Sequence, residues 1–428
     1  MLRILRGVGR VLLGLVLTVI AVWLLSRFWP LTGEQRQDIQ RLQAVQPPQG
    51  RNGFALLWTL QFDGLDMTQR EVALAQDLQR WQATPEQQAL QSILAVDHPR
   101  VASSAVARCN AHTADCLAQV RRDPQRFADA HAGHAGLHAR LGQLADFDRF
   151  DSPFQASGTA ALMPFPEYVL LFDGSAVSAQ AFAQGDTAAA LDSSCRALRF
   201  GRRLMHTGST LLDSMMGAAL VRSSAQLLGD MLVELPPDHA LPAACAAALQ
   251  PLQADEQSLC RAMQGEFAMN TAAVDASIQS AGAGLLLDRD HTLARVAGKF
   301  GWACRPAAAE ALAADLPLSV PPPSRWDVGC LANALGCTLS DIAGPAYVEY
   351  AARSQDAAAM VRLLGAQRWL RQQTDPPAQA LTRLPPQWHS PARTPTVSAD
   401  GRYLQVAQRA PARDGEQGPY LSIRLRAD

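Results

Sequence analysis

The 428-residue chain lacks the short motifs that identify common catalytic sites. There is no G-x-S-x-G, no phosphate-binding P-loop, no G-x-G-x-x-G, no H-E-x-x-H and no S-x-x-K. These absences remove the sequence evidence for the enzymes that carry such motifs, and they favour a non-enzymatic role. A catalytic triad assembled by folding from distant Ser, His and Asp residues stays open, although no residue is nominated for one.

An excess of charge of either sign is also absent. The 38 basic and 39 acidic residues give a net charge of −1, so we expect no nucleic-acid partner. Lysine is almost missing, because Lys299 is the only lysine among the basic residues, whereas alanine is abundant. This bias indicates a GC-rich genome and not an arginine-dependent function. No cofactor-binding pattern is present, and we expect no cofactor.

One long apolar run stands out, at residues 11–25, after a short N-terminus that contains arginines. The 16 uncharged residues between Arg10 and Arg27 are slightly fewer than the roughly 17–25 of a typical spanning helix. Trp23 and Trp29 lie where an interfacial aromatic belt is expected. We predict a transmembrane anchor over residues 11–29, with residues 1–10 in the cytoplasm and the rest of the chain in the periplasm.

A cleaved signal peptide is the alternative interpretation of this N-terminus. Cleavage needs small residues after the apolar run, but the segment from Trp23 to Trp29 contains no A-x-A site, and no lipobox cysteine is visible. We therefore expect an uncleaved anchor in the inner membrane of the cell, in a protein that crosses that membrane once.

Eight cysteines lie after the anchor, an even number that fits an oxidising compartment. They allow 105 pairings, and the sequence offers two local candidates, Cys109 with Cys116 and Cys330 with Cys337. A separation of seven residues rises about 10 Å along a straight helix, which is too far for a disulfide. Each bridge would therefore require a turn. Because there is no C-x-x-C, we expect disulfides and buried thiols, not redox catalysis.

Helical periodicity dominates the chain after the anchor. Its clearest part is an αα-hairpin, in which Gly185-Asp186 precedes one helix and Gly208-Ser209 precedes the next. Residues 396–408 and 419–425 instead alternate apolar and polar side chains, which predicts a small β-hairpin or three-stranded patch. The expected fold class is mainly α, with an N-terminal transmembrane helix, a multi-helix bundle of αα-hairpins and a small C-terminal β-hairpin.

Prolines divide this architecture into segments. We expect a stalk or linker over residues 30–50, a helical domain over 51–316, a second helical segment over 317–380 and a small β-containing segment over 381–428. Inside these segments we expect a helical pair over 241–280 and single helices over 291–312 and 342–373.

Three stretches carry a resemblance to known proteins: NGFALLWTLQFDG after the anchor, RCNAHTADCL around the first cysteine pair, and LRFGRRLMHTGSTLLDSMMGAAL in the αα-hairpin. In their order they resemble a group of uncharacterised, membrane-anchored, mainly helical periplasmic proteins of Gram-negative bacteria. The resemblance covers most of residues 50–235. It implies a location and a helical fold, and since no activity is assigned to the group it implies no chemistry.

The sharpest candidate for a chemical site is the segment HAGHAGLH, which contains His131, His134 and His138. In a helix, offsets of three and four residues would place the three imidazoles on one face, a workable arrangement for Zn, Ni or Cu. His112 could supply a fourth ligand. Against this hypothesis, two glycines weaken the helix, no glutamate lies nearby as a general base, and the alternative is a solvated helix face.

Two acidic clusters are weaker candidates. Asp288, Asp290 and His291 could serve acid–base or metal chemistry, but a carboxylate there is better explained as the N-cap of a following helix. The trio Asp146, Asp148 and Asp151 lacks the glycine and the terminal glutamate of a calcium-binding loop.

The function that we expect is that of a membrane-anchored periplasmic protein that binds or scaffolds an unknown protein partner in the cell envelope. Helical hairpins without a catalytic motif favour an interaction surface. One alternative is an immunity or inhibitor protein against a periplasmic toxin or hydrolase, and another is a metal-dependent hydrolase that uses His131, His134 and His138.

Overall fold

The computed structural model describes residues 2–83, 90–101, 109, 115–154, 156, 163–280, 286–319, 327–342, 347–412 and 418–426. Its longer helices are α1 (Leu2–Arg27), α2 (Gly33–Gln43), α4 (Met67–Ala83), α7 (Ala135–Leu144), α8 (Asp173–Ala183), α9 (Thr187–Thr207), α10 (Leu211–Leu232), α13 (Cys260–Ser280), α14 (Arg289–Phe300), α16 (Ala334–Ile342) and α17 (Tyr347–Arg371). Shorter helices are α3 (Phe54–Trp58), α5 (Cys116–Arg122), α6 (Pro124–His131), α11 (Ala244–Ala248), α12 (Ala254–Gln257), α15 (Pro306–Ala313) and α18 (Pro377–Ala380).

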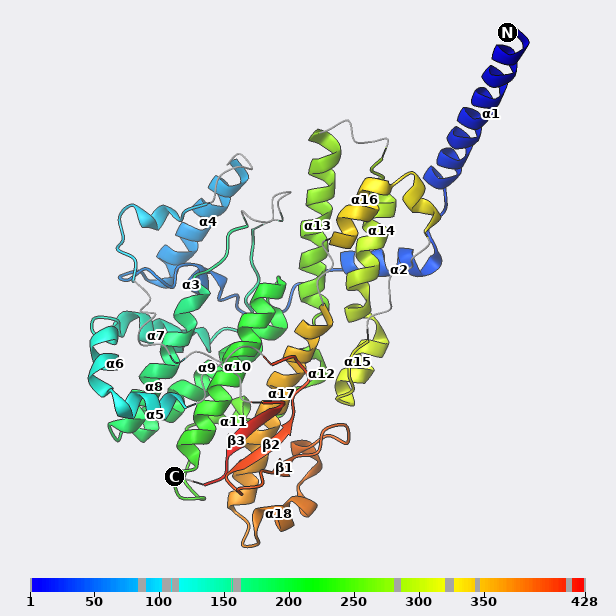
Figure 1. The fold of residues 1–428 in the computed structure, drawn as a ribbon. Helices are drawn as coiled ribbons and strands as arrows, with labels where there is room; N and C mark the ends of the chain where they lie inside the picture. Colours follow the sequence, from blue (N-terminus) through cyan, green and yellow to red (C-terminus); the bar gives the residue numbers. More distant parts are fainter. Residues whose placement is uncertain are drawn as a thin grey trace.

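Short 3-10 segments and three strands complete the fold (Figure 1). The 3-10 segments are η1 (Ile93–Ala95), η4 (Tyr168–Phe172), η6 (Gly301–Cys304), η7 (Val328–Leu331), η8 (Leu381–Arg383) and η9 (Pro386–Trp388), and the strands are β1 (Thr396–Val397), β2 (Tyr403–Ala407) and β3 (Tyr420–Arg424). The predicted fold class, mainly α with a small C-terminal sheet, is confirmed.

Helix α1 points away from the rest of the molecule, which it meets near its C-terminal end (Figure 1). Its stretch from Gly7 to Arg27 is long and apolar enough to cross a membrane, and the apolar side chains of residues 11–25 are largely exposed, whereas Ser26 near its end is buried. Val11 and Leu15 are 70% and 63% exposed. The apolar run is therefore one helix, which starts before the predicted anchor and ends at Arg27.

Helix α2 occupies the segment that we expected to be a stalk. Thr32 and Gln35 form a reciprocal capping box at its start. Along the helix Leu42 is buried, and the equally buried carboxylate of Asp38 pairs with Arg305. This polar helix is therefore attached to the body of the protein, against α14 and η6.

The predicted αα-hairpin is α9 and α10, and it lies at the centre of the molecule between α8 and α17 (Figure 1). The Asp186 carboxylate caps α9, and Thr210 forms a capping box with Asp213 at the start of α10. The two helices approach closely at Gly217, where a Cβ atom would lie 2.4 Å from the backbone nitrogen of Met205. The largest apolar core forms around this hairpin.

The C-terminal sheet has the order β1-β2-β3, with antiparallel pairing throughout. Leu404 and Ile423 are opposite each other in the register and are both buried. The sheet packs against α17 and α10, and Gly229 leaves the room that the Ile423 side chain fills. The strands therefore gain their stability from the helices beneath them, because so small a sheet does not stand alone.

Three of the expected helical segments differ from the structure in their bounds or continuity. The segment 291–312 is α14, η6 and α15, and Pro306 is the first residue of α15, a position where proline is favoured. The pair expected over 241–280 is the two short helices α11 and α12 followed by α13. The helix expected from 342 starts at Tyr347, as α17, while Ile342 is the last residue of α16.

All eight cysteines are paired. The disulfides are Cys109–Cys116, Cys195–Cys245, Cys260–Cys304 and Cys330–Cys337. In the local bridge Cys109–Cys116, the second cysteine is the first residue of α5, and the Cα atoms are 5.2 Å apart. In the local bridge Cys330–Cys337, the second cysteine lies inside α16, and the Cα atoms are 5.8 Å apart. The long-range bridge Cys195–Cys245 lies in the largest apolar core, and Cys304 of the other long-range bridge packs against a second core.

Candidate metal centre

The histidine segment forms a turn between two helices and not one continuous helix. Helix α6 ends at His131, and Gly133 has a φ of +80°, a conformation that glycine adopts at low cost. His134 then stands at the N-cap of α7, where its side chain makes no capping bond, and His138 follows one turn later. The expectation of a single helix face is therefore wrong in its backbone.

The turn nevertheless brings the three imidazoles together. The ring centroids of His131 and His138 are 5.3 Å apart, and that of His134 lies 6.3 and 6.4 Å from them. Leu137, between these residues in the sequence, is fully buried and attaches α7 to the core. His131 is buried, and His134 and His138 are half-buried, which differs from the solvated helix face that we considered as the alternative.

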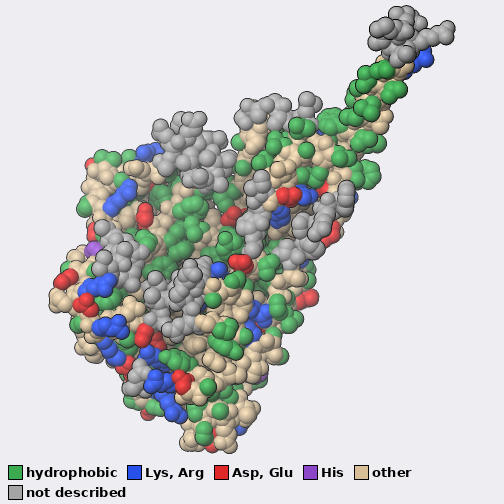
Figure 2. Space-filling model, viewed as in Figure 1, with side chains coloured by type: hydrophobic (Ala, Val, Ile, Leu, Met, Phe, Trp, Pro, Cys, Tyr) green, Lys and Arg blue, Asp and Glu red, His purple; other side chains and the backbone are tan. Residues whose placement is uncertain are grey.

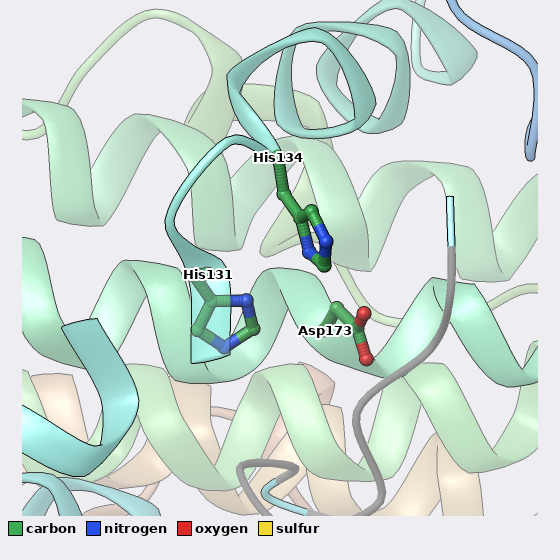
Figure 3. Close-up of side chains that lie close together, drawn as sticks. All are labelled: His131, His134 and Asp173. Carbon is green, nitrogen blue, oxygen red and sulfur yellow. The ribbon is translucent and has the colours of Figure 1, made fainter. Parts of the chain in front are cut away.

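A fourth ligand-type side chain comes from a distant part of the chain. Asp173 is the first residue of α8 and is fully buried. One ligand atom each from His131, His134 and Asp173 lies within 4.8 Å of the others (Figure 3). A Zn ion holds its ligands at about 2.0–2.2 Å, so bound ligand atoms are roughly 3.5 Å apart. Side-chain movements of about 1 Å would thus close these residues around an ion.

The imidazole of His138 is in the form that can donate a lone pair to a metal ion. Burial, with a contribution from the His131 and His134 rings and Arg140, lowers the pKa of His138 to about 4. This imidazole is therefore neutral at pH 7, the form that ligates metals. Within the described part of the chain, His134 Nδ1 and His138 Nε2 are buried without a hydrogen-bond partner. Such atoms are rare in folded proteins and need an explanation, for which an ion is one option.

A cavity of about 440 Å³ opens beside the cluster. His138 contributes to its wall, and the other polar lining includes Asp146, Ser178, Asp192 and Arg196. Arg196 pairs with both carboxylates, at 2.8 Å from Asp192 and 3.0 Å from Asp146. A small molecule in this cavity would touch the edge of the histidine cluster.

The sequence identified the three histidines but not Asp173. His112 lies outside the described residues. The signal for Asp173 was present but weak, because it is the single charged residue between Tyr168 and Gly185. A lone carboxylate in an apolar run that is buried on folding requires partners or a ligand, and only the fold shows that its neighbours are histidines.

The other two candidate clusters have structural roles. The Asp288 carboxylate accepts a hydrogen bond from the backbone nitrogen of His291 and caps α14, as expected, while Asp290 is exposed. In the acidic trio, each carboxylate binds a different arginine residue: Asp146 pairs with Arg196, Asp148 accepts from the Arg51 nitrogen, and Asp151 pairs with Arg261. These carboxylates do not form a common ligand set.

Comparison with known proteins adds no relative: no family model, no curated protein and no solved structure matches this chain.

Proposed function

We propose that this protein is a membrane-anchored protein of the cell envelope that binds a divalent transition-metal ion on its periplasmic side through His131, His134 and Asp173. The observation that carries the proposal is the convergence of these three ligand atoms within 4.8 Å in the protein interior. Nitrogen ligands from imidazole together with one carboxylate fit Zn, Ni or Cu better than Ca or Mg. His138 is placed to be a fourth ligand or to support the first three.

Two further observations support the location. Helix α1 has the length and composition of a single membrane span, and four disulfides are favoured by an oxidising compartment such as the periplasm. With its cytoplasmic N-terminus the protein would expose its body, including the metal centre, in the periplasm of a Gram-negative inner membrane. Because the cysteines are paired, they are not available as thiolate ligands, and the histidines are the nitrogen ligands that the chain offers to such an ion.

The test is metal binding by the full chain, purified in detergent without a polyhistidine tag, stripped with a chelator and titrated with zinc, nickel and copper. We expect one ion per chain by calorimetry and elemental analysis. His131→Ala and Asp173→Asn should each weaken binding by at least about tenfold. His206→Ala is the matched control, because His206 is in the last turn of another helix, outside the cluster.

Retention of the helical circular dichroism signal would show that each variant is folded. Absence of stoichiometric binding in the folded wild-type chain, or equal binding by all variants, would overturn the proposal and leave the histidines as packed neutral rings.

A second candidate, a metal-dependent hydrolase, is favoured by the cavity next to His138. A site with three protein ligands leaves a metal position for an activated water. Turnover of ester or phosphoester substrates that requires the metal would distinguish it from simple binding. The scaffold role and the immunity or inhibitor role stay predictions, for which a protein partner that copurifies with the chain is the measurement.

A further inference from the structure

The segment from Val328 to Ser340, VGCLANALGCTLS, contains no charged residue. It forms η7 and α16 and lies on the surface of the protein, next to the C-terminal end of α1 (Figure 1). A surface helix normally exposes its polar side and buries its apolar side, so an uncharged surface segment needs an explanation.

Here the usual arrangement is reversed. The buried side contains Asn333, Cys337 and Ser340, and the exposed side is mainly leucine. We define the leucine face as Val328, Leu331, Leu335 and Leu339, which are 43%, 59%, 39% and 46% exposed. Leu335 and Leu339 are four residues apart and lie on one side of α16, and Leu331, the last residue of η7, precedes them at the same interval. Leu286, also exposed, lies next to them, because its carbonyl accepts a hydrogen bond from the Leu335 nitrogen.

The leucine face is fixed to the end of α1 by specific bonds. Ser26, in the last turn of α1, is fully buried. Its hydroxyl donates to the Val328 carbonyl at 2.6 Å and accepts from the Ala332 nitrogen at 2.8 Å. The Arg27 side chain forms an ion pair with Asp288, 3.3 Å away. The orientation of this surface relative to the apolar helix is therefore set by the fold.

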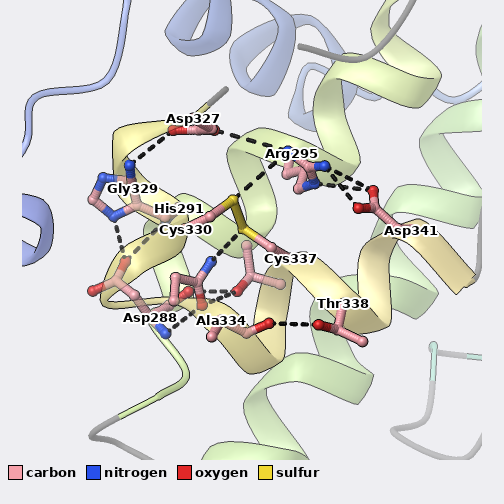
Figure 4. Close-up of a disulfide and its surroundings, with 12 residues drawn as sticks. Asp288, His291, Arg295, Asp327, Gly329, Cys330, Ala334, Cys337, Thr338 and Asp341 are labelled. Carbon is pink, nitrogen blue, oxygen red and sulfur yellow. Dashed lines mark hydrogen bonds and ion pairs between the residues drawn. A yellow bond between two sulfur atoms is a disulfide. The ribbon is translucent and has the colours of Figure 1, made fainter. Parts of the chain in front are cut away.

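The segment is also held in shape from the inside (Figure 4). The disulfide Cys330–Cys337 joins η7 to α16. Arg295 reaches the carboxylates at both ends of the segment, Asp341 at 2.8 Å and Asp327 at 4.0 Å. The carboxylates of Asp327 and Asp341, which flank the leucine face, are therefore both paired with Arg295. The exposed surface between them is apolar.

We infer that the leucine face inserts into the periplasmic leaflet of the membrane that α1 spans. This inference rests on the proposed membrane anchor. Apolar side chains run along α1 and continue onto the adjoining part of the body (Figure 2), and Phe28 and Trp29 beyond the helix are 78% and 51% exposed. A bilayer crossed by α1 reaches these aromatic residues at its interface. The leucine face, bonded to the same turn of α1, meets the same lipid.

The bilayer is a better occupant than a second copy or a soluble partner, because its position is given by α1 itself. An amphipathic helix whose apolar side lies in the headgroup and acyl boundary is a known mode of membrane attachment. The body of the protein would therefore be attached to the membrane through both α1 and the leucine face. Two adjacent attachments restrict its tilt relative to the membrane, which a flexible stalk would not do.

Photocrosslinking in vesicles tests this inference. A benzophenone amino acid replaces one residue of the full chain at a time, at position 335 in the leucine face, at 17 in α1, or at 316. Leu316 is the matched control, because it is a leucine with 49% exposure that follows α15, away from α1. The full-length variants are reconstituted into phosphatidylethanolamine and phosphatidylglycerol vesicles, irradiated and analysed for phospholipid adducts by mass spectrometry.

We expect adducts at 17 and 335, with a yield at 335 several-fold above that at 316. Adducts at 17 alone would overturn the inserted leucine face and leave the anchor in place. Adducts at none of the three positions would overturn the anchor and the inference together. A circular dichroism spectrum equal to that of the wild type verifies that each variant is folded.

Discussion

Two of the buried polar clusters in the described part of the chain differ in the side chains that compose them. Around Arg393 the guanidinium donates to both oxygens of Asp315, at 2.7 and 3.0 Å, and to Asp356 at 2.7 Å. Asp356 also accepts from the backbone nitrogens of Arg409 and Ala410. Near Asp173 lie instead the imidazoles of His131 and His134, with the ring of His138 next to them.

The Arg393 cluster is a structural network, whereas the histidine cluster is the proposed ligand site. In the Arg393 network, opposite charges satisfy one another across α17, the segment after α15 and the C-terminal region, so the network fixes distant parts of the chain. Burial of charges is tolerated when they are paired and fully hydrogen-bonded. The histidine cluster concentrates donors of electron pairs, and that is the composition of a metal site.

The largest expected effect comes from removing the central cation of the satisfied network. Arg393→Met leaves two buried carboxylates without their partner, and breaking a buried pair costs about 3–5 kcal/mol of the free energy of unfolding. Chemical and thermal denaturation of the full chain measure it. Arg383→Met is the control, because Arg383 and Asp375 form an exposed pair that contributes less than about 1 kcal/mol. Equal stability of both variants would remove the structural role of the network.

The second prediction uses the same chemical change in both clusters. Zinc at 100 times its dissociation constant should stabilise the wild type by about 2.7 kcal/mol. Asp173→Asn should lose most of this increment, because it removes a ligand oxygen charge. Asp356→Asn should lower the stability by about 2–4 kcal/mol yet keep the zinc increment. Thermal unfolding of both variants with and without zinc measures the difference. A zinc increment retained by Asp173→Asn would exclude Asp173 as a ligand.

The parts of the fold that the sequence predicted are those set by local chemistry. Asp186 and Asp288 each begin a helix through a side-chain cap, and such caps can be recognised within four residues. The alternation of apolar and polar side chains over 396–408 and 419–425 likewise predicted the C-terminal sheet, in which Gly401 has a φ of +69°. The disulfide connections between 195 and 245 and between 260 and 304 were not predictable, since many pairings fit the same spacing.

The parts of the site that escaped prediction depend on tertiary contacts. Asp173 meets the histidines only because α8 packs against α6 and α7, and no local pattern encodes that contact. The same holds for the leucine face: the leucine spacing in α16 predicts one apolar side, but whether that side meets a core, another protein or lipid is decided by the position of α1. Sequence periodicity identifies an apolar face and does not identify its partner.

The smallest expected effect concerns Asp230, a carboxylate intermediate between the two clusters. It is buried in α10, with Arg424 3.7 Å away and the Gln226 amide at 3.4 Å. Burial raises its pKa to about 7, although Arg424 acts in the opposite direction. Since this pKa is above the usual value near 3.9 of an unfolded chain, the folded state holds the proton more tightly. The stability from this group is complete below about pH 4 and is lost as the pH rises towards 7.

Asp230→Asn keeps a neutral side chain at every pH and should therefore flatten this decline. We expect the variant and the wild type to have similar unfolding temperatures at pH 4, and the variant to be the more stable of the two at pH 8, where burial disfavours the ionised carboxylate. The exposed Asp238→Asn is the control and should leave the pH profile unchanged. A variant less stable than the wild type at pH 8 would mean that the Arg424 pair outweighs desolvation. Asp230 would then resemble Asp315 and Asp356 in the Arg393 network. Its ionised form would be stabilised by Arg424 more than burial destabilises it.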